Sequence, residues 1–348
     1  MFRIQDSASN NFDFLRLFCA VLVILSHSYT IATGTPADEP LVRVTHGYVA
    51  FGQIAVDVFF VISGYLVTAS LMRSMSIWSY FRKRISRIYP GFIGATLFSL
   101  LFVGPLAAGS LQGTTVLSRA ALVIFRTLFL SDLRWRGAFS GNPLRGDVNG
   151  SMWTIPFEFA CYVMVAILGL CGVIRARRAC LLLFAICCVA KIGFSIYVWK
   201  FNPAIRDEFV ARGISFLPLF LAGAVGYLYR DRLEFRAPWA VVSLLTLGAV
   251  ANLPYGLGCV FPLAGAYLVL FLVHSPQIHL NHFGRHGDFS YGVYLYAWPI
   301  QQLVVQRVGG PMKPLALFFL ATPLTLAAAI LSWFLIERRF LSRSRLQH

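Results

Sequence analysis

The sequence contains few charged residues for its length. Only 13% of its 348 residues are Asp, Glu, Lys or Arg, whereas 58% are hydrophobic and the mean hydropathy is +0.70. A water-soluble domain of this composition could not cover its surface with polar side chains. The stretches between the apolar segments leave no room for a separate soluble domain. We therefore expect residues 1–348 to form a single integral membrane domain with no appended soluble domain.

Acidic residues are scarcer than basic ones, with 14 Asp and Glu against 30 Lys and Arg and a formal net charge of +16. In a soluble protein such a charge would indicate nucleic-acid binding. Here the basic residues form short clusters between apolar segments, as in cytoplasmic loops of multispanning proteins. We expect contact with membrane lipid and none with nucleic acid. The clusters are Arg82-Lys83-Arg84 with Arg87, then Arg175, Arg177 and Arg178, then Arg230, Arg232 and Arg236, and last Arg338, Arg339, Arg343 and Arg345.

The seven cysteines match no zinc-binding or redox motif and lie in or beside apolar segments, so we interpret them as small hydrophobic residues. Three of the seven histidines lie in the polar stretch 275–286, where their unequal spacing makes a poor metal site. No metal is expected.

Apolar segments of spanning length begin near residues 13, 49, 88, 115, 150, 178, 211, 237, 255, 287 and 313. The first is interpreted as an uncleaved span. With all basic clusters and both termini placed in the cytoplasm, residues 88–131 can cross only once although they contain two segments. The second of these is our candidate for the segment that does not span, because Arg119 and Arg126 share a helical face. The prediction is an all-α polytopic bundle of about ten spanning helices plus one re-entrant or interfacial segment.

Ionisable residues inside spans are costly, so each is a functional candidate. His27 follows Arg16 by eleven residues, which places both on one helical face about 16 Å apart, with Arg16 at the cytoplasmic end. Asp57 and Glu158 each lie about eight residues from the external end of their spans. Counted in this way, the three side chains reach one layer of the membrane. A histidine with two carboxylates is the composition of a general base with orienting acids, although helix-packing hydrogen bonds would also explain such residues.

Aromatic and amide side chains accompany these spans. Aromatic faces stack on sugar rings and amides can bind sugar hydroxyls, whereas an interfacial aromatic belt is the alternative explanation. The candidates are Trp153 and, in the segment near 287, Tyr291, Tyr294, Trp298, Gln301 and Gln302.

The run YFRKRISRIYP places Arg82, Arg84 and Arg87 where a phosphorylated donor would enter from the cytosol, because guanidinium groups bind phosphate in a bidentate fashion. The same residues would equally serve to set the topology and to contact anionic lipid.

Taken together, the ordered motifs resemble those of the acyltransferase-3 family of integral membrane acyltransferases over nearly the whole chain. The matching motifs are FDFLRLFCAVLVILSH, VDVFFVISGYLV, FRKRISRIYP, SMWTIPFEFACY, FLPLFLAGAVGYL, SYGVYLYAWPI and SWFLIERRF. The resemblance implies transfer of an acyl group, most often acetyl from cytoplasmic acetyl-CoA, to a hydroxyl of an extracytoplasmic or lipid-linked glycan. It also implies a catalytic role for His27 and donor binding by Arg16, Arg84 and Arg87.

Ala297 stands where many members of this family carry a second histidine, so none is assigned there. Our hypothesis is an O-acetyltransferase of the bacterial cytoplasmic (inner) membrane, with His27 as catalytic base or acyl acceptor and Asp57 or Glu158 orienting it. The alternative is a proton-coupled transporter or a glycolipid flippase, in which the same residues relay protons. The glycan, the acyl chain length and the oligomeric state are left open by the sequence.

Overall fold

The computed structural model describes residues 2–3, 11–107, 124–131, 133–134, 137–201, 209–275 and 287–345. Within these ranges the chain is helical apart from two short antiparallel strand pairs. β1 (Phe2–Arg3) pairs with β4 (Glu234–Phe235), and β2 (Leu133–Arg134) pairs with β3 (Asp147–Asn149). The all-α architecture is confirmed.

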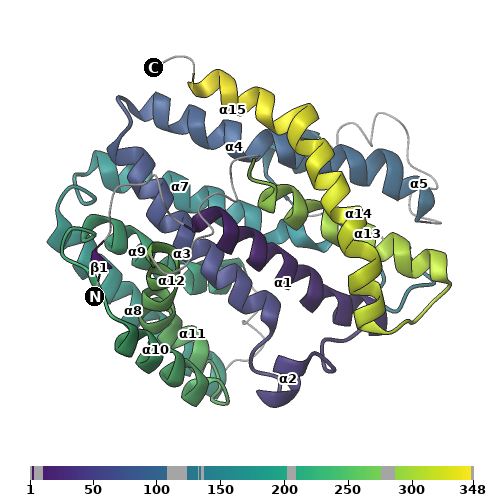
Figure 1. The fold of residues 1–348 in the computed structure, drawn as a ribbon, viewed down its shortest axis with the longest axis horizontal. Helices are drawn as coiled ribbons and strands as arrows, with labels where there is room; N and C mark the ends of the chain where they lie inside the picture. The colour runs from purple at the N-terminus through teal and green to yellow at the C-terminus, as the bar shows by residue number, and fades with distance from the viewer. Residues whose placement is uncertain are drawn as a thin grey trace.

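Ten crossings of the bundle can be followed in the described residues (Figure 1). Eight are long and apolar enough to cross a membrane, while α10 is shorter and α13 is more polar. They are α1 (Phe12–Thr33), α3 (Phe51–Met72), α4 (Ile77–Phe98) continued to α5 (Gly104–Leu106), Gly150–Thr154 with α7 (Ile155–Leu170), α8 (Arg177–Lys200), α9 (Phe209–Leu228), α10 (Ala237–Val250), α11 (Gly256–Val260) continued to α12 (Ala266–His274), α13 (Ser290–Val308), and α14 (Pro314–Ser332) continued to α15 (Arg338–Arg345).

Helix α4 begins eleven residues earlier than the predicted start near residue 88. The Oγ of Ser76 accepts a hydrogen bond from the backbone N–H of Ser79 at 3.1 Å, which caps the helix there. The arginine cluster that was predicted to lie in a loop is therefore the first part of a helix. Its apolar residues Phe81, Ile85 and Ile88 recur at helical spacing among the basic ones, so the segment lacks the continuous apolar run by which spans were located. A π-helical segment, Ser99–Val103, joins α4 to α5.

The segment predicted to begin near residue 115 lies mostly outside the described residues, as does Arg119, and so does the histidine stretch from residue 276 to 286. Of the former segment, residues 124–131 are described. The hydroxyl of Tyr89, midway along α4, donates to the carbonyl of Leu128 at 3.4 Å. This end of the segment thus lies beside the middle of α4.

The basic clusters gather at one end of the bundle, which we call the basic end. Arg177 pairs with Asp231 at 2.8 Å, which joins the clusters before α8 and after α9. Helix α15 lies beside α4 (Figure 1), which joins the first and last clusters. The short helix α2 (Pro40–Val44) lies at the opposite end. Placement of the basic end in the cytoplasm remains a prediction from the positive-inside rule.

Helix α13 is the central element of one half of the bundle. It packs on α1, α4 and α14, and every residue from Ser290 to Gln302 is buried. Other helices cover all its sides, so it tolerates tyrosine and glutamine where a lipid-facing helix would need aliphatic side chains.

Helices α3 and α9 make the closest backbone contact in the bundle. A Cβ added at Gly64 would lie 1.9 Å from the carbonyl oxygen of Phe220, and one added at Gly223 would lie 2.0 Å from that of Val61. Small residues permit such approach between spanning helices, where no hydrophobic driving force acts. The spacing of small residues in FLPLFLAGAVGYL therefore encodes a helix contact.

Alanine at either contact glycine should destabilise the protein, because backbone atoms of the partner helix occupy the space of the methyl group. We expect Gly64→Ala and Gly223→Ala each to cost about 1–3 kcal/mol or more, seen as a lower Tm of the detergent-purified protein. Gly193→Ala is the control, because no atom lies within 4 Å of its added Cβ and alanine favours the helix. An unchanged Tm in the first two variants would contradict the contact.

Candidate functional site

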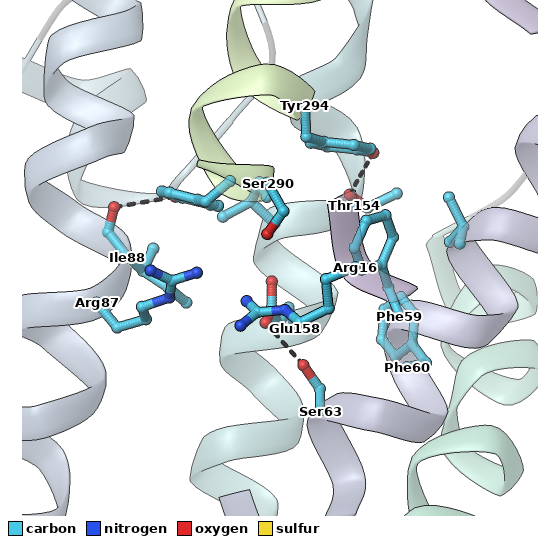
Figure 2. Close-up of a pocket in the computed structure, with 13 residues that line it drawn as sticks. Arg16, Phe59, Phe60, Ser63, Arg87, Ile88, Thr154, Glu158, Ser290 and Tyr294 are labelled. Atoms are coloured by element: carbon cyan, nitrogen blue, oxygen red, sulfur yellow. Dashed lines mark hydrogen bonds between the residues drawn. The ribbon is translucent and has the colours of Figure 1, made fainter. Parts of the chain in front are cut away.

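A cavity opens between α1, α3, α4, α7 and α13 (Figure 2), with about 600 Å³ of empty space including its open mouth. Its walls combine two guanidinium groups, one carboxylate, hydroxyls and aromatic rings, contributed by Arg16, Arg87, Glu158, Ser63, Thr154, Ser290, Phe59, Phe60, Tyr291 and Tyr294. A concave, mostly apolar space with a few converging polar groups is typical of a small-molecule site. No group of three or more potential metal ligands occurs within the described ranges.

Arg16 and Arg87 share one carboxylate at the basic end of this cavity. Nη1 of Arg16 and Nη2 of Arg87 each lie 2.5 Å from Oδ2 of Asp288, and all three side chains are less than one-fifth exposed. The other oxygen, Oδ1, accepts hydrogen bonds from the backbone N–H of Ser290 at 3.2 Å and from its hydroxyl. Burial raises the pKa of Asp288, but the two guanidinium groups and Ser290 outweigh this and lower it to about 2. Asp288 is therefore ionised at neutral pH.

Glu158 lies on the opposite wall of the cavity from Arg87. It accepts hydrogen bonds from the Ser63 hydroxyl at 3.0 Å and from the Tyr162 hydroxyl. Figure 2 shows Glu158 between Arg16 and Ser63, and no ion pair within 4 Å joins it to either arginine among the described residues. The carboxylate thus faces the cavity with acceptor capacity to spare.

Tyr294 closes the cavity toward the opposite end of the bundle. Its hydroxyl forms a hydrogen bond of 2.8 Å with Thr154, and its ring meets Phe59 edge-on with centroids 6.0 Å apart. Figure 2 shows Tyr294 above the two carboxylate-binding arginines, at the far end of the cavity.

His27, on α1, lies beyond Tyr294. It contacts Trp298, which follows Tyr294 by one turn of α13. Its ring contacts Trp298 edge-on with centroids 4.7 Å apart, and Trp298 is fixed because its Nε1 donates to the carbonyl of Asp147 at 3.1 Å. Nδ1 of His27 is buried and makes no hydrogen bond within the described residues. His27 and Arg16 belong to the same helix, but only Arg16 lines the cavity.

The three proposed catalytic groups do not share one layer as the sequence predicted. Glu158 bonds to Ser63, which lies six residues beyond Asp57 on α3, so Glu158 is about 9 Å deeper along that helix. The 3-10 helix Gly150–Thr154, which precedes α7, advances farther per residue than an α-helix and contributes about 2.5 Å of this difference. Among the described residues, no hydrogen bond joins His27 to either carboxylate.

Asp57 lies on the face of α3 that packs against α9. It precedes Val61 and Gly64 by four and seven residues, and both of these meet α9. The buried ammonium group of Lys191 on α8 acts on it electrostatically, and Nζ of Lys191 donates to the carbonyl of Ser215 at 3.0 Å. Asp57 thus lies at the packed interface of α3 with α9 and away from His27 and the cavity lining.

The remaining donor candidates lie closer to the basic end. Nη2 of Arg84 lies 3.3 Å from the Ser70 hydroxyl, and its guanidinium carbon lies 5.7 Å from the centre of the Tyr162 ring. Within the described residues Arg84 forms no ion pair. Arg82 is half-buried on the same helix turn and lines no part of the cavity.

The predicted sugar-binding residues mainly contact the protein itself. Trp153 packs against Phe216, with the guanidinium of Arg212 4.4 Å from its ring centre. Nε2 of Gln301 donates to the Ser28 hydroxyl at 2.7 Å and to the carbonyl of Ile24 at 2.9 Å.

Gln302 is completely buried and has both ends of its amide engaged. Its Oε1 accepts from Asn142 at 2.7 Å, and its Nε2 donates to the carbonyls of Leu144 at 3.1 Å and Asp147 at 3.4 Å. Gln302 therefore packs α13 against the loop before α7, because both of its N–H donors are engaged and the side chain is completely buried.

Sequence reasoning missed three buried charged residues, Glu39, Lys191 and Glu337, and the half-buried Asp288. Glu39 is fully buried at the end opposite the basic end, where it accepts hydrogen bonds from the Ser26 hydroxyl at 2.6 Å and from the backbone N–H of Phe51. It thus ties α1, next to His27, to the start of α3. The signal was available for Lys191, a lone lysine within an apolar run. Asp288 and Glu337 lay beside segment ends, where charges are usual.

Comparison with known proteins places the acyltransferase domain on residues 9–334. The chain is 30% identical to an O-acetyl transferase of Shigella phage Sf6, over 97% of each chain. It is 31% identical to nodulation protein 10 of Rhizobium leguminosarum bv. viciae, over 94% of this chain and 92% of that protein. A putative membrane-bound transacylase, BcsY, of Komagataeibacter xylinus is 26% identical over 84% of this chain and 77% of its own. No solved structure matches.

Removal of the Lys191 ammonium should destabilise the protein by about 3–5 kcal/mol, because it leaves Asp57 buried without its compensating charge. We expect Lys191→Met to lower the Tm strongly and the double variant Asp57→Asn/Lys191→Met to regain most of the loss. Lys200→Met, at the exposed end of the same helix, is the control and should have little effect. Additive losses in the double variant would show that the two groups do not interact.

Proposed function

Because this chain belongs to the family of membrane acyltransferases whose domain covers residues 9–334, we propose that it transfers an acetyl group from acetyl-CoA to a hydroxyl of a cell-surface or lipid-linked glycan. The observation that carries the proposal is the match to the acyltransferase domain over nearly the whole chain. The similarity to a phage O-acetyl transferase over 97% of both chains supports acetyl as the group and oxygen as its acceptor.

The donor enters from the basic end, which we place in the cytoplasm together with both chain termini. The position of Arg82, Arg84 and Arg87 on the first part of α4 supports this assignment, since the helix leads from the basic end into the cavity. Arg16 and Glu158 line the same cavity farther in. Movement of Tyr294 would extend this route to His27.

His27 performs the chemistry in this proposal. As a general base it takes the proton of the glycan hydroxyl, the hydroxyl oxygen attacks the thioester carbonyl, and the CoA thiolate leaves. Alternatively, its imidazole attacks the thioester carbonyl first and expels the CoA thiolate, and the glycan hydroxyl then takes the acyl group from the acyl-imidazole and releases the free imidazole. The buried Nδ1, which has no hydrogen-bond partner in the described part of the chain, supports a neutral ring that awaits a ligand.

The acceptor approaches from the end opposite the basic end, which we place outside the bacterial cytoplasmic membrane. Trp298 beside His27 offers an aromatic face of the kind on which sugar rings stack. Glu158 is proposed to act within the donor cavity. Its bonds to Ser63 and Tyr162 support this role better than orientation of His27.

We expect His27→Ala to abolish acetyl transfer, a loss of about 10²-fold or more, with the protein still folded in the membrane. The measurement is release of CoA thiol by purified protein supplied with acetyl-CoA and a glycan acceptor. His46→Ala is the matched control, because His46 is exposed and its Nδ1 lies 3.1 Å from Asn252 in the region opposite the basic end. Full activity in the His27 variant would refute its role.

The acceptor can be identified by mass spectrometry of surface glycans from a deletion strain and its parent. Loss of about 42 Da per modified sugar, the mass of an added acetyl group, is the expected result. Identical glycans, together with glycolipid movement and no thioester cleavage by the purified protein, would instead favour the transporter.

A further inference from the structure

We infer that the cavity bounded by Arg16, Arg87 and Glu158 binds the uncharged amide arm of the thioester donor, and not its phosphates, and that Asp288 is the positioning residue responsible. The inference rests on the proposed function and refines it, because the sequence suggests Arg87 as a phosphate ligand.

The charges around the cavity argue against a phosphate there. The two guanidinium charges of Arg16 and Arg87 are balanced by the carboxylates of Asp288 and Glu158. Glu337, which is also buried, acts on Arg87 electrostatically as well. A phosphate would bring more negative charge into a buried region that already has enough, and such burial is costly without new positive partners.

Asp288 lies behind the arginines and outside the space a ligand would fill. It is absent from the cavity lining, although Arg16, Arg87 and the neighbouring Ser290 all belong to it. Its Oδ2 binds one terminal nitrogen of each arginine, and its Oδ1 is held by Ser290 at the start of α13. The carboxylate therefore neutralises and orients the two guanidinium groups while their remaining N–H groups face the cavity.

The hydrogen-bonding groups that face the cavity suit an amide, because they comprise the N–H donors of two arginines and one carboxylate acceptor. The guanidinium N–H groups on one side can donate to a carbonyl oxygen, and Glu158 on the other can accept from an amide N–H. Phe59, Phe60 and Tyr291 supply apolar surface for the methylene groups between amides. The pantetheine arm of CoA, with two amides joined by short aliphatic links, has this alternation.

The phosphates then bind nearer the basic end, where Arg84 forms no ion pair among the described residues. Arg84 lies on the same face of α4 as Arg87, about one turn closer to the start of the helix. An extended donor can therefore place its nucleotide at Arg84 and its arm in the cavity.

A comparison of two donors tests the inference: acetyl-CoA and S-acetyl-pantetheine, which keeps the amide arm but lacks every phosphate. We expect Asp288→Asn in detergent-purified protein to raise KM for both donors by about tenfold or more, by factors that agree within about twofold. Arg84→Ala should raise KM for acetyl-CoA alone. Asp231→Asn is the matched control, because it breaks an exposed ion pair at the same end and should change neither KM.

An Asp288→Asn effect confined to acetyl-CoA would overturn the inference, because it would locate a phosphate at the two arginines. Unchanged KM values for both donors would overturn it as well. Arg87→Lys provides a second variant that keeps the charge and loses the planar fork, and it should again affect both donors equally. KM for the glycan should stay within about twofold, whereas general misfolding would instead lower kcat and the Tm.

Ligand binding, measured without acetyl transfer, distinguishes failure of this inference from failure of the proposed function. Adenosine 3′,5′-bisphosphate carries only the nucleotide end of CoA, so its binding, followed as a shift in Tm, should be weakened by Arg84→Ala and unaffected by Asp288→Asn. Binding of CoA itself should be weakened by both variants. A wild-type protein that binds CoA with this pattern and transfers no acetyl group would contradict the function and uphold the inference, and the reverse pattern would contradict the inference alone.

Discussion

A single carboxylate shared by two guanidinium groups organises the basic half of this protein. Asp288 connects α1, α4 and the start of α13 through bonds to Arg16, Arg87 and Ser290. Charged groups at this depth are tolerated only when they compensate one another, so each of the three helices can take its position only with the other two in place. Arg16, Arg87 and Ser290 also line the cavity, so the same contacts fix one end of its wall.

The cavity and His27 are separated by side chains that are themselves engaged. Tyr294 is bonded to Thr154 and packed on Phe59, and Trp298 is bonded to the backbone at Asp147. An enzyme that brings a thioester from one side of a membrane and an alcohol from the other must prevent water and ions from passing between them. Under the proposed function, the aromatic side chains of Tyr294 and Trp298 between the cavity and the histidine serve that requirement.

Much of the fold was predictable, because the length of an apolar run sets the number of crossings and basic loops set their parity. The start of α4 was not, since an amphipathic helix beginning at Ser76 interrupts the apolar run that length counting requires. Residue types at the site were also predictable: Arg16, Arg87, Glu158 and Tyr294 do line one cavity. Their partners were not, because Asp288 is 272 residues distant from Arg16 in the chain.

The depth of polar side chains within the membrane was the least reliable inference from the sequence. Counting residues from a span end assumes that every span begins at one level and rises as an α-helix, and the 3-10 turn at Gly150–Thr154 breaks the second assumption for Glu158 by about 2.5 Å. Helix rotation mattered equally for Asp57, whose face is determined by the contact at Gly64 and Gly223. Neither the rise nor the rotation can be obtained from composition.

The polar character of α13 has a consequence for biogenesis. This helix is as long as α14 but falls short of the hydropathy expected of an independent span, because it is surrounded by protein. A segment of this kind partitions poorly from the translocon into lipid by itself. Its insertion therefore depends on contacts with α1 and α4, which are made long before it. We expect it to insert together with the apolar α14 as a hairpin. The last steps of synthesis, rather than the first, complete the site.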